Sequence, residues 1–185
     1  GYFVGTCYDG NSVFNLLSKK DKGESINLYK NGEKIWEITK QYSNEEFPDD
    51  ESSLGYSIDV YQETINKVFR EYLVNYKFLK RVLENYGFTE LNKDELLELG
   101  LKSSTGMFSE LYSTMKLEIS KNEKKHYGNA DNMSDEEKTI SFLNRFFIFK
   151  KNRNVDPDKI KDQYTDPLTE EEKKMAEEIL ESLEK

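Results

Sequence analysis

Apolar and polar positions form separate blocks at the start of the chain, and the blocks predict a strand followed by a helix. Tyr2–Cys7 is a short apolar run of the kind that forms a strand buried on both faces. The polar stretch Asp9–Ser12 interrupts it. Asn11 or Ser12 is suited to cap the next helix, whose apolar side begins at Val13. Strand, polar turn and helix make a unit typical of α/β folds, which bind ligands at the carboxyl ends of parallel strands.

The next segment alternates with a period of two, which indicates antiparallel strands. Ser25–Tyr29 and Ile35–Tyr42 alternate between apolar and polar residues, and Asn31-Gly32 lies between them. This dipeptide predicts a tight hairpin, because both of its turn residues need a positive φ. Leu54–Tyr61 alternates in the same way and is expected to extend the sheet.

The stretch Phe69–Phe88 organises the middle of the chain. It begins as an extended segment that carries Glu71 between bulky residues, and it continues as a helix. One face of this helix is apolar at spacings of three and four residues and consists of Leu73, Tyr76, Leu79, Leu83 and Tyr86. Gly87 follows the last turn, where a helix favours a residue that adopts a positive φ. Phe88 is expected to start the next strand, with Thr89–Leu91.

The rest of the chain predicts further helices, one buried strand and a tail. Helices are expected over Lys93–Leu99, over Gly106–Ser120 and after Ser134. The first and last of them begin with predicted capping boxes, Asn92 with Glu95 and Ser134 with Glu137. Phe146–Phe149 is a candidate buried strand, and Asp156–Asp166 has the composition of a linker. A last amphipathic helix is expected after Thr169, with a narrow stripe of Met175, Ile179 and Leu183. Together these patterns predict an α/β domain with an inserted antiparallel portion.

Charge and cysteine content narrow the class of protein. The 185 residues carry a net charge of −9, which argues against a protein that coats nucleic acid. Phe142–Tyr164 nevertheless holds six basic against three acidic side chains, and Thr165–Lys185 holds eight acidic against three basic ones. A local basic edge of this kind is compatible with contact to a phosphate chain, but the signal is weak and a solvated surface is the favoured explanation. The single Cys7 suits a reducing compartment, and with one histidine in the chain a zinc site is not expected.

Motifs that name a reaction are absent from the sequence. There is no G-x-G loop, P-loop, G-x-S-x-G or H-E-x-x-H. The sole cysteine–histidine pairing, Cys7 with His126, would join a strand-like run to a polar loop and is not favoured as a catalytic pair. No run approaches the roughly 18 apolar residues of a membrane span, and no signal peptide is recognisable, so no membrane contact is expected. Composition and spacing therefore leave the substrate open.

Four stretches of the sequence resemble one enzyme family when taken in order. They are Gly1–Gly10, Asn31–Trp36, the pair Arg70–Val74 with Leu83–Phe88, and Ile140–Lys151. Arg70–Val74 contains the family's E-[FY]-L-V pattern as Glu71-Tyr72-Leu73-Val74. In this order and spacing the chain resembles the C-terminal half of mRNA cap guanine-N7 methyltransferases, particularly those encoded by large DNA viruses.

The resemblance implies a fold, a cofactor and partners. Residues 1–151 would be the C-terminal portion of a class I, S-adenosylmethionine-dependent, Rossmann-like methyltransferase domain with an antiparallel cap-binding insertion. Residues 152–185 would be a linker and an acidic amphipathic helical tail. S-adenosylmethionine would be bound mainly by a missing N-terminal half, with no metal, and this chain alone would be inactive. The expected partners are 5′-capped RNA and other capping-enzyme domains or a subunit. The expected location is intracellular: cytoplasmic for a viral enzyme, nuclear for a cellular one.

The resemblance also implies site residues. Glu71 stands at the position of the glutamate that recognises the cap guanine. Tyr8 replaces a proline found in many cellular members, in the turn after the first strand. An aromatic residue that contacts the guanine near the start of the last strand aligns with Asn144, and Phe146 lies two residues further on. Two alternatives remain open: a class I methyltransferase with another substrate, and a non-catalytic binding module of a capping complex.

Overall fold

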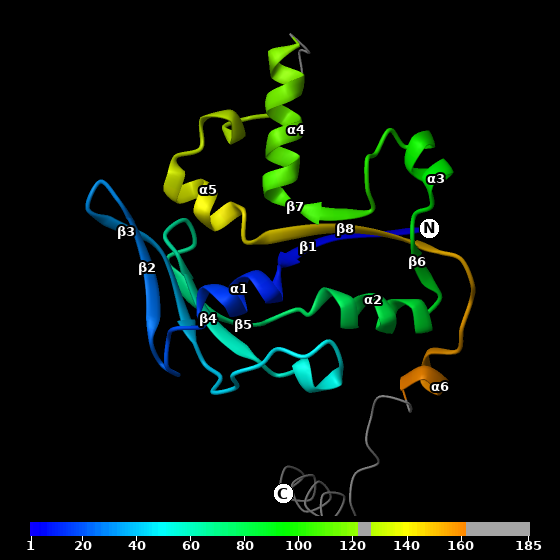
Figure 1. The fold of residues 1–185 in the computed structure, drawn as a ribbon, viewed down its shortest axis with the longest axis horizontal. Helices are drawn as coiled ribbons and strands as arrows, with labels where there is room; N and C mark the ends of the chain where they lie inside the picture. Colours follow the sequence, from blue (N-terminus) through cyan, green and yellow to red (C-terminus); the bar gives the residue numbers. More distant parts are fainter. Residues whose placement is uncertain (122–126, 162–185) are drawn as a thin grey trace, which may run out of the picture.

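The fold of this chain combines two four-stranded sheets with helices on either side of the first (Figure 1). It is seen in a computed structural model that describes residues 1–121 and 127–161. The elements, in chain order, are β1 (Tyr2–Tyr8), α1 (Gly10–Leu16), β2 (Ser25–Lys30), β3 (Glu33–Lys40), η1 (Glu51–Ser53), β4 (Ser57–Gln62), β5 (Lys67–Tyr72), α2 (Tyr76–Asn85), β6 (Phe88–Glu90), α3 (Lys93–Glu98), β7 (Thr105–Met107), α4 (Phe108–Ser120), η2 (Ala130–Asn132), α5 (Asp135–Ser141), β8 (Asn144–Lys151) and α6 (Pro157–Lys161). The predicted α/β class with antiparallel strands is confirmed.

The first sheet is built around β8. β1 pairs with one edge of β8 along its whole length, from Tyr2 opposite Lys150 to Tyr8 opposite Asn144. β6 and β7 follow one another along the other edge of β8. All three of these pairings with β8 are antiparallel, so the described part of this sheet is antiparallel. α1 and α2 lie on one side of these strands, and α4 and α5 on the other (Figure 1).

The second sheet is an antiparallel meander in the order β2-β3-β4-β5. Its first turn confirms the predicted hairpin: Asn31 and Gly32 have φ values of 53° and 85°. Alternate side chains of β3 and β4 form the inner face, with Trp36, Ile38 and Ile58 each at most 1% exposed. β5 is the outer strand, and all six of its residues are exposed. Its free backbone edge therefore borders the solvent.

The main core fills the space between α1 and the second sheet. Val13 and Leu17 from the α1 region are fully buried against Trp36, Ile38 and the neighbouring apolar side chains of the inner face. The rings of Phe14 and Tyr42 stack beside them at a centroid distance of 5.6 Å. α1 thus packs on the inner face of the second sheet, and Tyr8 at the end of β1 is partly buried against the same core.

The stretch Phe69–Phe88 adopts the predicted strand–helix–strand order. Asn75 caps α2 by accepting a hydrogen bond from the Phe78 amide, and Gly87 ends it with a φ of 84°. The predicted apolar stripe is incomplete, because Phe78, which it omits, is the buried residue within α2. Phe88 begins β6 as expected.

Several local predictions were wrong. Tyr2–Cys7 is a strand, but among the described residues it is an edge strand: Tyr2, Phe3 and Val4 are 42–65% exposed, and β8 is the one described strand that pairs with it. The N-cap of α1 is Asp9, whose carboxylate accepts the Ser12 amide, and not Asn11 or Ser12.

Two more corrections concern helix boundaries. Residues 105–107 form β7, so α4 starts at Phe108 and not at Gly106. Part of the expected linker is the short helix α6. The helix expected after Thr169 and the residue His126 lie outside the described residues.

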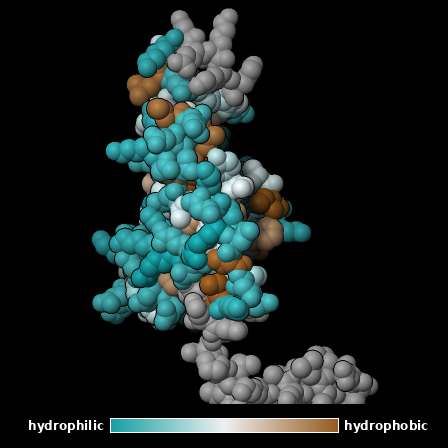
Figure 2. All heavy atoms as spheres, turned by 90° about the vertical axis from the view of Figure 1, so that its right-hand side faces the viewer, coloured by the Kyte–Doolittle hydropathy of each residue, from teal (hydrophilic) through white to brown (hydrophobic). Residues whose placement is uncertain are grey.

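The surface at the α3 and β6 end is mostly hydrophilic, with small separate hydrophobic patches (Figure 2).

Candidate functional site

Tyr8 lies at the carboxyl end of β1 and reaches the second sheet. The Trp36 Nε1–H donates a hydrogen bond of 3.2 Å to the Tyr8 hydroxyl oxygen, and the Gln62 side chain also hydrogen-bonds this oxygen. Burial raises the pKa of Tyr8, these two hydrogen bonds oppose the rise, and the negative charge of Glu71 adds to it. The charge of Glu71 therefore acts on Tyr8, a predicted site residue far from it in sequence. The register nevertheless separates them: Glu71 stands opposite Ile58, four residues along β4 from the Gln62 that faces Trp36.

Glu71 projects from β5 on the inner face of the second sheet. It stands directly opposite Ile58, which is fully buried, and opposed residues of antiparallel strands share a face. The residue as a whole is exposed at the sheet edge, yet desolvation by nearby protein atoms raises the pKa of its carboxyl group. Arg70 is no partner, because its guanidinium binds Asp59 at 2.8 Å on the other face. No side chain among residues 1–121 and 127–161 forms a hydrogen bond or ion pair with Glu71.

Asn144 and Phe146 occupy different surroundings. Asn144 is the direct β8 partner of Tyr8, but its amide nitrogen donates to the Ile140 and Ser141 carbonyls at 3.2 Å and so closes the end of α5. Phe146 lies on the same face of β8, where it lines a pocket of about 510 Å³ beside α4. The fold thus places Asn144 beside Tyr8 and places Glu71 on the inner face of the second sheet, which Tyr8 contacts through Trp36. It places Phe146 in another pocket. None of this tests their predicted contact with guanine.

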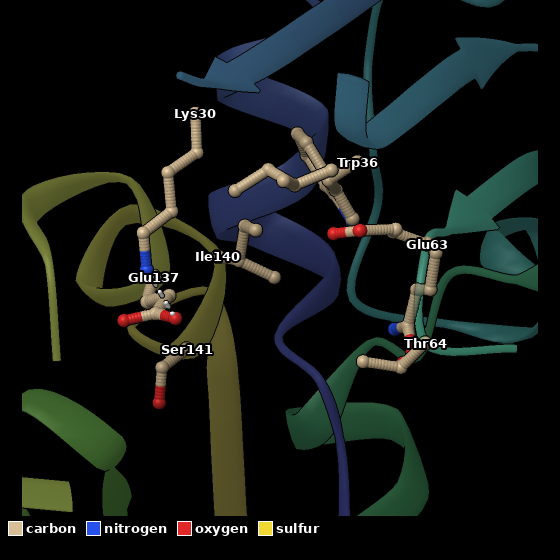
Figure 3. A pocket seen from close by; sticks show the side chains of 9 residues that line it. Lys30, Trp36, Glu63, Thr64, Glu137, Ile140 and Ser141 are labelled. Atoms are coloured by element: carbon tan, nitrogen blue, oxygen red, sulfur yellow. Dashed lines mark hydrogen bonds and ion pairs between the residues drawn. The ribbon is translucent and has the colours of Figure 1, made fainter. Parts of the chain in front are cut away.

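A pocket of about 300 Å³ adjoins Tyr8 through two shared residues, Trp36 and Gln62. It lies between α5 and the hairpin ends of the second sheet (Figure 3). Lys30 extends from β2 to Glu137 on α5 and forms an ion pair of 2.9 Å, while Glu63 lies on the opposite wall. The remaining lining residues are Ile35, Thr64, Ile140 and Ser141.

Sequence reasoning missed a buried ion pair at the turn after β1. Asp9 is 5% exposed, and its Oδ2 accepts a 2.8 Å hydrogen bond from Arg145 Nε, while Oδ1 accepts from Ser12. Burial raises the pKa of Asp9, but the hydrogen bonds from Arg145 and Ser12 outweigh it and leave the pKa below its usual value. The guanidinium also lies 4.6 Å from the centre of the Tyr76 ring. The available sequence signal for this ion pair was Arg145, a lone arginine beside the apolar run of β8.

The turn after β1 does not form a cradle for a cofactor. A Cβ on Gly10 would meet the carbonyl oxygen of Val74 at 2.5 Å, so protein backbone already fills the space that the glycine opens. The Gly10 amide donates to that same oxygen at 3.0 Å. The residues present there do not fit S-adenosylmethionine. Within the described parts of the chain there is also no group of three or more His, Cys, Asp or Glu side chains placed to hold a metal ion.

None of the helices in residues 1–121 and 127–161 has the length and apolar character needed to cross a membrane.

Comparison with known proteins relates the chain to a viral protein. No family model matches it. It is similar to the "Probable mRNA-capping enzyme" of Acanthamoeba polyphaga mimivirus, with 29% identity over 175 residues. The match covers 84% of this chain and 14% of the relative, so the chain spans a small part of that protein's length. The chain is therefore related to a segment of a protein named as a capping enzyme.

Proposed function

We propose that this chain takes part in mRNA capping and forms the C-terminal part of a cap guanine-N7 methyltransferase domain. Its own task is to recognise the guanine, and Glu71 does so. The observation that carries the proposal is the Glu71 carboxylate: it has no partner among the described residues, it is partly desolvated, and it lies on the inner face of the second sheet, which Tyr8 contacts through Trp36. The relation to a viral protein named as a capping enzyme supports the reaction class.

A carboxylate at this position suits guanine. Guanine presents N1–H and the exocyclic N2–H side by side on one edge, and the two carboxylate oxygens accept both. Adenine offers no such pair of donors. Glu71 is partly desolvated, so its charged carboxylate is less stable there without hydrogen-bond partners than it would be in water. A guanine that donates two hydrogen bonds would offset this loss of hydration.

The same carboxylate would favour methyl transfer. Methylation at N7 places a positive charge on the guanine ring, and a carboxylate on the opposite edge stabilises that charge more in the transition state than in the ground state. N7 has a free lone pair and needs no general base. Glu71 and its neighbours therefore have to hold the base in one orientation and keep N7 free.

The cofactor and the remaining partners lie beyond the residues of this site. S-adenosylmethionine would supply the methyl group, and its site is proposed in chain outside this segment, because the turn at Gly10 does not fit it. The RNA following the cap, and other capping-enzyme domains or a subunit, are the proposed partners. Residues 152–185 are proposed as an appendage to the domain. The start of this segment is tied to α2, since the Asn152 amide donates to the Gly87 carbonyl at 2.9 Å.

Product analysis on the complete reading-frame product tests the proposal. The protein is incubated with S-adenosylmethionine and capped RNA, and the position of the new methyl group is determined. We expect methylation at N7 of the cap guanine. Glu71→Ala should lower the rate of methylation at subsaturating cap, because it removes about 2–4 kcal/mol of guanine-binding free energy. Methylation of another base or of a sugar would support a class I methyltransferase with another substrate. Cap binding without methylation would support a non-catalytic module.

A further inference from the structure

An apolar groove lies between α2 and the turn that contains η1. It has a volume of about 380 Å³, and Phe78, Val82 and Tyr86 line it from α2 and its C-cap. Leu54 and Tyr72 form the facing wall, and their side chains are 64% and 59% exposed. Large apolar side chains therefore border the solvent here. The cavity bounded by these five residues is called the α2 groove below.

The spacing of residues along the α2 groove matches a pattern near the end of the chain. The three groove residues from α2 and its C-cap are four positions apart, so they form one ridge on the helix. Met175, Ile179 and Leu183 repeat this spacing within residues 169–185, where the sequence predicts an amphipathic helix and which lie outside the described residues. Ridges of residues four apart interdigitate in the commonest class of helix packing. The α2 groove is thus a suitable surface for this stripe.

The chain after β8 is held at one end of the α2 groove. The Asn152 amide donates to the Gly87 carbonyl at 2.9 Å, and the Arg153 guanidinium donates to the Glu84 carbonyl at 2.8 Å. In Figure 1, α6 lies below the C-terminal end of α2, and the turn with η1 (cyan) lies below its other end. Residues 162–168 span roughly 25 Å when extended, more than the roughly 15 Å length of α2. The segment that follows them can therefore reach the groove.

The charges of the groove rim and of this segment are complementary. Arg81 is exposed beside the groove, with its Cζ 5.8 Å from the centre of the Phe78 ring. No carboxylate within residues 1–121 and 127–161 forms an ion pair with it. Residues 165–185 hold eight acidic against three basic side chains. A cation at the rim of an apolar groove favours a segment whose apolar stripe is flanked by acidic side chains.

The acids of the neighbouring η1 turn have partners of their own. Asp49 forms an ion pair of 2.7 Å with Lys77. Asp50 accepts the Ser52 amide at 3.0 Å and so caps η1. Arg81 therefore keeps its five N–H donors for a further carboxylate.

We propose that residues 169–185 dock in the α2 groove of their own molecule, with Met175, Ile179 and Leu183 against the ridge of α2 and acidic side chains beside Arg81. Docking would remove the apolar groove wall from water, which is the main driving force for such contacts. The inference does not depend on the proposed role of Glu71. It would make the acidic end of this chain a bound part of the domain.

Site-specific photo-cross-linking of the complete reading-frame product tests the proposal. Benzoylphenylalanine replaces Leu54 on the groove wall, and the cross-linked peptides are identified by mass spectrometry after irradiation and digestion. We expect cross-links from position 54 to peptides within residues 169–185. Benzoylphenylalanine in place of Leu97, which is 83% exposed on α3, is the control and should not reach these peptides. A mixture of isotopically light and heavy protein shows whether a cross-link joins one molecule or two.

Two pairs of variants test the apolar and the charged contacts. Ile179→Ser should lower the equilibrium constant for docking by about tenfold, the value of one buried apolar side chain, and the yield of the cross-link should fall. Glu177→Ser, on the opposite side of the predicted helix, should leave the yield unchanged. Arg81→Glu should lower the yield, because it replaces the cation at the rim by an anion. Lys93→Glu, on α3, should leave it unchanged.

Three results would overturn the proposal. Cross-links that join a light and a heavy molecule would assign the α2 groove to a second copy of the chain. Cross-links from position 54 to another part of the protein, with none to residues 169–185, would assign it to that part. A yield that Ile179→Ser leaves undiminished would show that the apolar stripe does not bind there.

Discussion

The Trp36 indole nitrogen donates a 3.2 Å hydrogen bond to the Tyr8 hydroxyl oxygen, and this bond joins the two sheets. Tyr8 ends β1 of the first sheet, and Trp36 lies in the middle of β3 of the second. The contact fixes the carboxyl end of β1 relative to the strand pair that leads to Glu71. The candidate site therefore depends on how the two sheets are joined.

Removal of the indole donor should show that coupling. Trp36→Phe keeps an aromatic ring but loses Nε1–H, and we expect a loss of unfolding free energy of about 1–3 kcal/mol from the missing bond and the lost ring volume. Combined with Tyr8→Phe in a double-mutant cycle, the pair should give a coupling energy of about 0.5–1.5 kcal/mol. Denaturant titration measures each variant. Strict additivity of the two losses would contradict a direct bond.

Loss of the Asp9 charge should be costly. Asp9→Asn keeps an N-cap side chain but leaves the Arg145 guanidinium without its buried carboxylate, and we expect a loss of about 3–5 kcal/mol at neutral pH. The control is Asp59→Asn, because Asp59 pairs with Arg70, whose side chain is 54% exposed, and should cost less than about 1 kcal/mol.

The difference between parent and Asp9→Asn should also depend on pH. The pKa of Asp9 in the folded protein lies below its ordinary value of 3.8, so the carboxylate contributes fully above pH 3.8 and loses its contribution as the pH falls through the lower folded-state value. Unfolding free energies of the two proteins should therefore converge below pH 3.8. A gap that stays constant into that acid range would count against the ion pair.

Gly87 should resist substitution more than another glycine with a positive φ. A Cβ at Gly87 would run into the Arg153 carbonyl group, whereas Gly100, with a φ of 67°, has open space around it. We expect Gly100→Ala to cost about 1 kcal/mol from backbone strain alone, and Gly87→Ala to cost more than about 2 kcal/mol because residue 153 must also move. Thermal or chemical unfolding compares them. Equal costs would show that α2 and the segment after β8 are not packed as described.

Cys7 should react slowly in the folded protein. Burial, together with the charge of Asp9, raises the pKa of its thiol to about 11, so the reactive thiolate is scarce at pH 8. Because the chain has one cysteine, iodoacetamide labelling reports on it alone. We expect the folded protein to react about 100-fold more slowly than the denatured protein, from the difference in thiolate fraction. Similar rates in both states would contradict the buried environment.

Local signals in the sequence were sufficient for the turns and caps. The Asn31-Gly32 hairpin, the Asn92 and Ser134 capping boxes and the Gly87 helix end all follow from chemistry within four residues, and all are present. β7 was missed because it has three residues and leads directly into α4, whose periodicity masks it. Burial of Tyr2–Cys7 was predicted from composition, but burial depends on which strands are neighbours.

The arrangement of the candidate site could not be predicted from local sequence patterns, because it depends on contacts between residues far apart in the chain. Tyr8 reaches the inner face that carries Glu71 only through the packing of two sheets, and Asp9 and Arg145 meet across 136 residues of sequence. Resemblance to a family supplied Glu71, Tyr8, Asn144 and Phe146 as candidates. It supplied neither Trp36 nor Gln62 as groups that hold Tyr8, because their role follows from the register of β3 and β4.

The affinity of the complete reading-frame product for a capped dinucleotide, measured for the parent and for Glu71→Gln, tests the central claim most directly. Glu71→Gln keeps the shape of the side chain and removes a carboxylate that has no partner among the described residues, so folding stability should change by no more than about 0.5 kcal/mol. The matched control is Glu33→Gln, at the exposed start of β3. We predict that Glu71→Gln weakens GpppA binding at least tenfold and that Glu33→Gln leaves it unchanged. GpppA binding that survives Glu71→Gln undiminished would contradict the assignment of Glu71 to the guanine.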